Sequence, residues 1–339
     1  MSTIEKSELK RVIAAVKGGK IATVGGPDGF KRRPASKNRR AAVRMVESVA
    51  GKAGLDLDKV SDLLAADQKA LRGAFDKRRA AAARNFRAAE KVFRSGMAAR
   101  FEALKLLQVP FASSFITLDK PFLIWQLPNP QLDIFIDSQI ASMNSSVRVL
   151  VNINEGSNST RFVFFYLWRN DSDFFAVANV ASSLIVNGAC LVGAAAGVFS
   201  GDRATLNAAA SLSIIRWSGW GNDPVTGESN DQKPHPNVQA TQRRQVAFLE
   251  AEGGHVFQSG DFEDQSFSFE PFPVSHSLLV VPGNAVVLFH VALELSYGID
   301  GGLTIPDQVF VDFSESGNGV FCPNLELEIL TPLPALVSP

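Results

Sequence analysis

The spacing of apolar residues changes from a helical to a strand period about one third of the way along the chain. Within residues 1–20, four apolar side chains fall at helical spacing, namely Leu9, Val12, Ile13 and Val16. This predicts one short amphipathic helix. From Phe115 onward the period becomes two, as on a half-buried strand. The switch falls beside Pro110, which cannot continue a helix.

A second helical pattern has a step of eleven residues. Its two apolar columns are Val60, Leu71, Ala82, Phe93 and Leu104, and Leu64, Phe75, Phe86 and Met97. Eleven residues in three turns are close to the period of a straight helix. The pattern predicts a long amphipathic helix over residues 56–109, weakened only by Gly73 and Gly96. Its cationic sides suit partner helices, an anionic membrane surface or nucleic acid.

The remaining chain reads as about a dozen short strands with no convincing helix. Residues 161–168 (RFVFFYLW) are apolar on both faces, which predicts a central strand, and Val286–Tyr297 has one fully apolar face. Asn187-Gly188 between apolar runs predicts a hairpin turn. Other strand candidates include Phe115–Leu118, Phe122–Trp125, Phe174–Val180, Ser183–Val186, Ala204–Trp217, Val246–Leu249, Asp264–Phe269, Ser277–Val281 and Gln308–Phe313.

These patterns predict an α+β multidomain chain: a basic helical N-terminal segment followed by an all-β antiparallel sandwich, jelly-roll-like in strand number and length. The expected parts are a basic, partly flexible arm with short helices, the long helix, the sandwich and a tail; they span residues 1–55, 56–109, 113–332 and 333–339.

Charge is sorted along the same boundary. Residues 1–112 hold 25 basic and 11 acidic residues, a net charge of +14, and residues 113–339 hold 9 basic and 23 acidic residues, a net charge of −14. Such asymmetry suggests a basic segment for an anionic partner. Residues 31–40 hold six cations and no acid, as a phosphate-binding arm or a solvated linker would. The anion-binding candidates are Lys31, Arg32, Arg33, Lys37, Arg39, Arg40, Arg44, Arg78 and Arg79.

Candidate chemistry changes this picture little. The four histidines stand at no metal-ligand spacing, and no nucleophile elbow, phosphate loop or C-x-x-C motif occurs. We therefore expect no catalytic residues, no metal, no cofactor and no enzyme activity. Cys190 and Cys322 are expected to be reduced core residues. In the long loop over residues 217–237, Trp217 is expected in the core, whereas Trp220 between two glycines is a candidate exposed ligand-stacking residue.

Location follows from what the sequence lacks. No apolar run reaches the length of a membrane span, and the first residues have no continuous apolar core of a signal peptide. The chain is expected to be cytoplasmic or part of an assembled particle.

A basic arm joined to a β-sandwich is similar to the layout of coat proteins of small icosahedral viruses. That resemblance implies a structural protein that self-assembles through its sandwich, with the basic segment neutralising nucleic acid. The opposite charges also allow residues 1–112 of one copy to contact the acidic surface of another. The alternative is a β-sandwich module that binds carbohydrate or protein and is oligomerised or docked to a membrane by its helix. Either way a homo-oligomer is expected.

Overall fold

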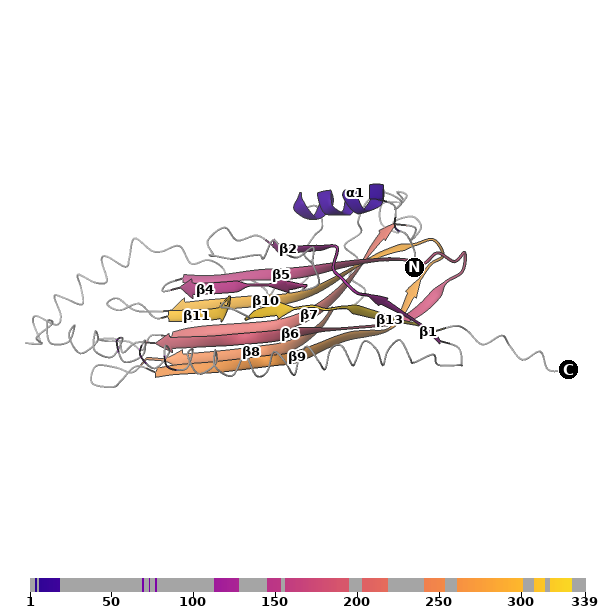
Figure 1. The fold of residues 1–339 in the computed structure, drawn as a ribbon. Helices are drawn as coiled ribbons and strands as arrows, with labels where there is room; N and C mark the ends of the chain where they lie inside the picture. The colour runs from indigo at the N-terminus through magenta and orange to yellow at the C-terminus, as the bar shows by residue number, and fades with distance from the viewer. Residues whose placement is uncertain are drawn as a thin grey trace, which may run out of the picture.

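Two antiparallel β-sheets face each other in the part of the chain that the computed structural model describes (Figure 1). Before the sandwich it describes residues 4, 6–18, 69, 73 and 77. The described residues of the sandwich are 113–127, 145–153, 156–194, 203–218, 241–253, 261–300, 308–314 and 318–330.

One helix and thirteen strands are assigned in those residues. The helix is α1 (Lys6–Lys17). The strands are β1 (Ser113–Leu118), β2 (Leu123–Leu127), β3 (Ser146–Val147), β4 (Val149–Ile153), β5 (Gly156–Arg169), β6 (Ala176–Ala194), β7 (Arg203–Ser218), β8 (Thr241–Glu252), β9 (Asp261–Val281), β10 (Val286–Asp300), β11 (Gln308–Phe313), β12 (Gly319–Phe321) and β13 (Leu325–Leu330).

The strand order is that of a jelly roll. In the first sheet β9 pairs with one edge of the long strand β6, and β11 followed by β4 pairs with the other edge. Beyond β11 the same edge of β6 continues with β12 and β13, and β1 lies outside β13. The second sheet has the order β2-β5-β10-β7-β8. Consecutive strands from β4 to β11 therefore change sheet at every connection except β7 to β8. The predicted antiparallel sandwich is confirmed.

The main core lies between the two sheets. On β10 the side chains that alternate into it include Phe289, Val291 and Leu293, all fully buried. This is the face that the sequence marks as wholly apolar. The opposite face of β10 carries Leu288 and Ala292, which belong to a second and smaller cluster. Both faces of the second sheet are therefore partly apolar.

Helix α1 covers one end of the outer face of the second sheet. Val12 and Val16 are buried against side chains of β5, β7 and β10, among them Phe165 and Trp217. Lys17 Nζ lies 5.3 Å from the centre of the Trp125 ring on β2. Figure 1 shows α1 lying over β2 and β5. The predicted short helix is confirmed, and its packing explains why residues 161–168 are apolar on both faces.

The hairpin predicted at Asn187-Gly188 is wrong. β6 runs through both residues, and its pairing with β9 shifts register between Val186 and Gly188, which is a β-bulge. Gly188 has a φ of 142°, and a Cβ there would lie 2.3 Å from the carbonyl oxygen of Asp312. Asn187 is buried and donates to Asn318 Oδ1 at 3.0 Å. The Asn-Gly pair thus serves a bulge that only tertiary contacts define.

Two further strand boundaries differ from the prediction. The candidate Phe174–Val180, from Ala176 onward, and the candidate Ser183–Val186 belong to the single strand β6, and Asp264–Phe269 and Ser277–Val281 are parts of β9. β9 contains Pro271 and Pro273 and has β6 as its only partner among the described residues. Proline is tolerated at such an edge because the missing N–H would have faced away from the sheet.

Little of the predicted basic helical segment is described beyond α1. Lys69, Gly73 and Lys77 are helical and exposed, and their spacing of four residues places them on one side of a helix. The rest of residues 56–109 lies outside the described residues.

Candidate functional site

A cleft of about 1010 Å³ opens at the end of the sandwich near α1. Its walls come from β1, from the end of β5 and the turn that follows it, from the end of β13, and from Ile4 and Leu9 at the helix. The apolar lining includes Phe115, Ile116, Leu118, Phe122, Phe174, Phe175, Ile329 and Leu330. Polar lining residues include Ser114, Thr117, Asp119, Lys120, Asp171 and Ser172.

The turn between β5 and β6 is held by Asn170. The Asn170 side chain is buried, and its Nδ2 lies 2.8 Å from the carbonyl of Phe174 and 3.0 Å from that of Pro282. Its Oδ1 accepts a hydrogen bond of 2.8 Å from the hydroxyl of Ser172. A buried amide with all its groups paired fixes the backbone around it. The turn is therefore a defined rim of the cleft.

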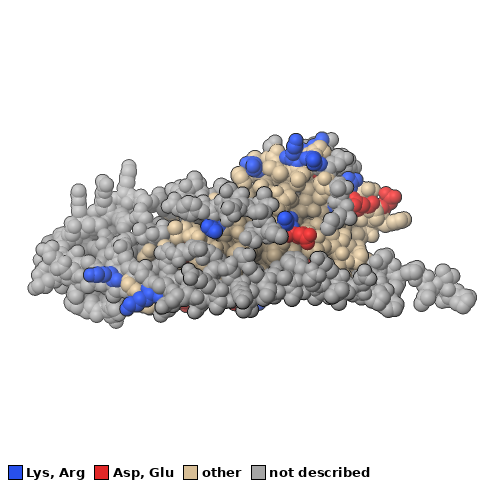
Figure 2. All heavy atoms as spheres, in the orientation of Figure 1, with Lys and Arg blue, Asp and Glu red and all other residues tan. Residues whose placement is uncertain are grey.

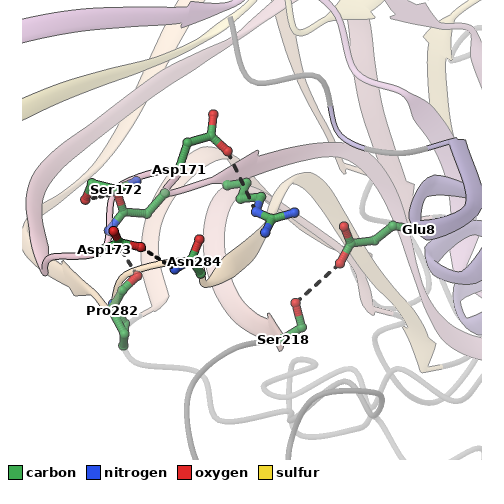
Figure 3. A network of polar contacts seen from close by, with 9 residues as sticks. Glu8, Asp171, Ser172, Asp173, Ser218, Pro282 and Asn284 are labelled. Atoms are coloured by element: carbon green, nitrogen blue, oxygen red, sulfur yellow. Dashed lines mark hydrogen bonds and ion pairs between the residues drawn. The ribbon is translucent and has the colours of Figure 1, made fainter.

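A neighbouring turn supports the same rim (Figure 3). Asn284 donates to Asp173 Oδ1 at 3.1 Å and, through its backbone N–H, to the carbonyl of Ser172 at 3.0 Å. A Cβ on Gly283 would lie 2.5 Å from the backbone of Asp173, so only glycine allows this approach. The two turns are packed backbone to backbone.

Two phenylalanines stand exposed on this rim. Phe174 is 80% and Phe175 69% exposed, and Phe115 on β1 is 46% exposed. On the outer face of the first sheet, Phe115 on β1 pairs with Glu328 on β13, and Glu328 pairs with Asn179 on β6. The side-chain amide oxygen of Asn179 accepts a hydrogen bond from the backbone N–H of Leu278 on β9. These contacts place Phe115 and Leu278 in one row across the outer face, with Glu328 and Asn179 between them. We call this group the apolar end surface: Phe115, Phe174, Phe175, Leu278 and Val280.

Charges of both signs flank the cleft. Asp119, Asp171 and Asp173 are exposed beside it, and Asp171 Oδ1 lies 3.7 Å from Arg169 Nε. The exposed face of α1 carries Lys6, Lys10, Arg11 and Lys17. In Figure 2 the basic side chains gather at the top over α1 and acidic ones lie beside the right-hand end.

The inner wall of the cleft is tied to the opposite sheet. Tyr166 on β5 donates to the carbonyl of Cys322 at 2.8 Å, and its oxygen lies 3.2 Å from Cys322 Sγ. Burial raises the pKa of Cys322 to about 11 and raises the pKa of Cys190 further. Both cysteines are free and buried, as predicted.

A second buried polar cluster lies on the outer face of the second sheet. Glu294 on β10 is 2% exposed and meets Arg161 at 3.2 Å, Arg243 at 2.7 Å and the hydroxyl of Ser211 at 3.0 Å. The burial of Arg161 lowers its pKa, and the carboxylate of Glu294 opposes that shift. The Glu294 carboxylate lies between two guanidinium groups, and none of the three residues is part of the cleft lining.

His290 lies four residues before Glu294, on the same face of β10. Its ring stands edge-on to Phe165 with centroids 4.5 Å apart, and its Nε2 is buried without a hydrogen-bond partner. Burial, reinforced by the charge of Arg161, lowers the pKa of His290 to about 3. The histidine is therefore a neutral residue of the sheet at ordinary pH.

The structure does not test the predicted site residues. Lys31, Arg32, Arg33, Lys37, Arg39, Arg40, Arg44, Arg78, Arg79 and Trp220 lie outside the described residues. Trp217 is 6% exposed near the end of β7, which confirms it as a core residue. Where the chain is described, no cluster of three or more His, Cys, Asp or Glu suits a metal ion, and no helix is long and apolar enough to cross a membrane.

Sequence reasoning missed the cleft. The sequence predicts a strand over Phe174–Val180, whereas β6 begins at Ala176 and leaves the rings of Phe174 and Phe175 exposed. The available signal was two adjacent aromatic residues directly after the polar turn Asn170–Asp173. β1 and β13, which supply the other wall, meet only through tertiary pairing.

Comparisons with known proteins give no family. No family model matches the chain, and no curated protein sequence matches it. Similar solved structures include TmCBM61 in complex with beta-1,4-galactotriose, at 7% identity, with 57% of this chain and 87% of that chain covered and a TM-score of 0.18. CsCBM6-3 from Clostridium stercorarium in complex with cellobiose has 9% identity, covers 56% and 94%, and has a TM-score of 0.16. Infectious bursal disease virus Gt strain has 13% identity, covers 61% and 44%, and has a TM-score of 0.16.

Proposed function

We propose that this chain is a non-enzymatic structural protein that assembles with copies of itself through the sandwich. The apolar end surface carries this proposal. Large apolar side chains exposed singly are ordinary on a monomer, whereas several at one site favour an interaction, and Phe115, Phe174 and Phe175 line the same cleft. Phe174 and Phe175 protrude from a turn that buried hydrogen bonds hold in place. Rigid aromatic side chains of this kind lose little conformational entropy on association.

The charge distribution supports a second part of the proposal. The segment of residues 1–112 carries +14 and the remainder −14. The helix that begins this segment is anchored on the sandwich by Val12 and Val16, and its outer face is cationic. We propose that the basic segment contacts an anionic partner, either packaged nucleic acid or the acidic surface of another copy.

Assembly is tested with the purified full chain. We expect oligomers or particles by light scattering and negative-stain microscopy, and their loss in the double variant Phe174→Ser, Phe175→Ser. Phe248→Ser is the matched control, because Phe248 is 51% exposed on β8 of the other sheet. A wild-type chain that stays monomeric at high concentration would overturn the proposal.

The identity of the anionic partner is tested by measuring nucleic-acid affinity at different salt concentrations. If the basic segment binds nucleic acid, the affinity of the full chain for RNA or DNA should fall steeply with ionic strength, because binding releases condensed counterions. Replacing Lys31, Arg32 and Arg33 together by alanine should flatten that dependence. An affinity that does not change with salt would exclude a phosphate-binding role and leave the acidic protein surface as the partner.

The cleft favours one alternative function, a ligand-binding module. Its volume matches that of small-molecule sites, and it combines aromatic side chains with carboxylates such as Asp119 and Asp171. A carbohydrate or peptide ligand would stack on these rings. Glycan-array binding that is lost in Phe174→Ser, or in Trp220→Ala for the loop site, would favour the module over the structural protein.

A further inference from the structure

The cleft is open along the edge of a β-sheet. β1 is the outermost strand of the first sheet at this end, with β13 as its one strand partner among the described residues. Five successive residues of β1, Ser114 to Leu118, line the cleft, so the groove runs beside an edge strand. Unpaired backbone groups on such an edge, together with apolar pockets beside it, form a receptor for an extended peptide.

The described chain ends at this same cleft. Leu330, the last residue of β13, pairs with Ser113 and is part of the cleft lining. Nine residues follow it in the sequence, TPLPALVSP, and none of them is charged. Their composition matches the cleft: Leu333, Leu336 and Val337 are apolar, and three residues are proline. Proline-rich segments bind aromatic-lined grooves well because their extended conformation is largely set before binding.

The expected direction of residues 331–339 favours docking in the cleft of another copy over docking in their own. Pro332 and Pro334 disfavour helical backbone at Thr331 and Leu333, the residues before them. We therefore expect the segment to leave the sheet in an extended conformation rather than reverse at once over its own cleft. Nine residues in that conformation span about 28 Å.

We propose that residues 331–339 of one copy dock in the cleft of a second copy, beside β1 and against Phe115, Phe174 and Phe175. This inference rests on the proposed self-assembly and names the contact that carries it. The cleft accepts an uncharged, proline-containing extended segment, and the chain supplies one at the position where its last strand ends.

The test is a complementation experiment with two full-length variants. The cleft variant carries Phe174→Ser and Phe175→Ser and keeps its C-terminal segment, whereas the tail variant carries Leu333→Asp and Leu336→Asp and keeps its cleft. We expect neither variant to assemble alone. An equimolar mixture should form a 1:1 complex and stop there, because only one intact tail and one intact cleft remain per pair.

A direct measurement accompanies it. A labelled TPLPALVSP peptide should bind the tail variant, and a peptide with both leucines replaced by aspartate should bind at least about tenfold more weakly. The affinity of the cleft variant for the wild-type peptide should be lower by a similar factor. Phe248→Ser should change neither result.

The outcomes separate this inference from the assembly proposal. If the tail variant assembles as wild type while the cleft variant does not, the apolar end surface assembles the protein without the tail, and the tail inference is wrong. If the wild-type chain is monomeric yet the peptide binds the tail variant, the segment occupies its own cleft and intermolecular docking is wrong. Failure of the peptide to bind any form would also overturn it.

Discussion

The hydroxyl of Tyr166 on the second sheet donates a 2.8 Å hydrogen bond to the backbone carbonyl of Cys322, directly after β12 of the first sheet. The bond crosses the sandwich behind the cleft, since Tyr166 is also a lining residue. Burial raises the pKa of Tyr166 well above its ordinary value, so the phenol stays a donor. One buried hydrogen bond thus ties Tyr166, a lining residue of the cleft, to the opposite sheet.

Removing that hydroxyl should lower the free energy of unfolding. We expect Tyr166→Phe to cost about 1–2 kcal/mol, because the carbonyl of Cys322 is left buried without its donor. Chemical denaturation measures this. Tyr297→Phe is the matched control, because Tyr297 is equally part of the core but its hydroxyl has no hydrogen bond to the described residues. Equal losses in the two variants would show that the hydrogen bond contributes nothing specific.

Docking of α1 should depend on Val12. The side chain is fully buried against the second sheet, so Val12→Asp would place a carboxylate in an apolar contact. We expect the amides of residues 6–17 to lose their hydrogen-exchange protection while the sandwich strands keep theirs. Ala14→Asp makes the same change on the exposed side of the helix and should leave protection unchanged. Loss of protection throughout the sandwich would contradict a helix that undocks by itself.

The carboxylate of Glu294 should contribute more to the free energy of unfolding than is usual for a residue on the outer face of a sheet. Glu294→Gln leaves Arg161 partly buried without its counter-charge, and we expect a loss of about 3 kcal/mol in the free energy of unfolding. Glu250→Gln removes the partner of exposed Arg203 and should cost less than about 1 kcal/mol. Thermal and urea unfolding of both variants measure the difference. Similar costs would mean that the buried cluster is as weak as a surface ion pair.

His290 should make the protein less stable in acid. Its pKa is about 3 in the folded chain against an ordinary value of 6.5. Between these two values the unfolded chain binds a proton that the folded chain does not, so the free energy of unfolding falls as pH is lowered through this window. For this residue alone we expect a loss of about 2 kcal/mol between pH 7 and pH 5.

The His290 contribution is isolated with a variant that cannot titrate. His290→Gln should lose correspondingly less stability than wild type over that interval, because every other titratable group is the same in both proteins. A slope unchanged by His290→Gln would contradict a neutral, buried imidazole.

Where a helix or strand has one face buried in the core, its apolar periodicity was enough to predict the element and its buried face. The alternation over Val286–Tyr297 predicted β10 and its core face, and the helical spacing of Val12 and Val16 predicted α1 and its buried side. The doubly apolar run at residues 161–168 predicted a central strand, although what covers its outer face was not predictable from the run itself.

The sequence-based interpretation is wrong at residues that interrupt the apolar periodicity and whose role depends on a long-range contact. Asn187-Gly188 resembles a turn, yet it is the bulge where Gly188 lets the backbone of Asp312 approach. The predicted strands Asp264–Phe269 and Ser277–Val281 leave out Pro271 and Pro273, yet β9 runs through both prolines because its edge position tolerates them. Phe174 and Phe175 resemble core residues, yet they project beside a cleft.

The sequence by itself determined the antiparallel sandwich, the short N-terminal helix and the two reduced cysteines, because burial imposes a local period on the residues that meet the core. Only the tertiary structure decided that α1 packs on the second sheet, that the strands follow the jelly-roll order, and that β1, β13 and the turn after β5 enclose a cleft. These depend on which distant segments become neighbours, and that information lies in the packing of side chains from different strands rather than in the period of any one of them.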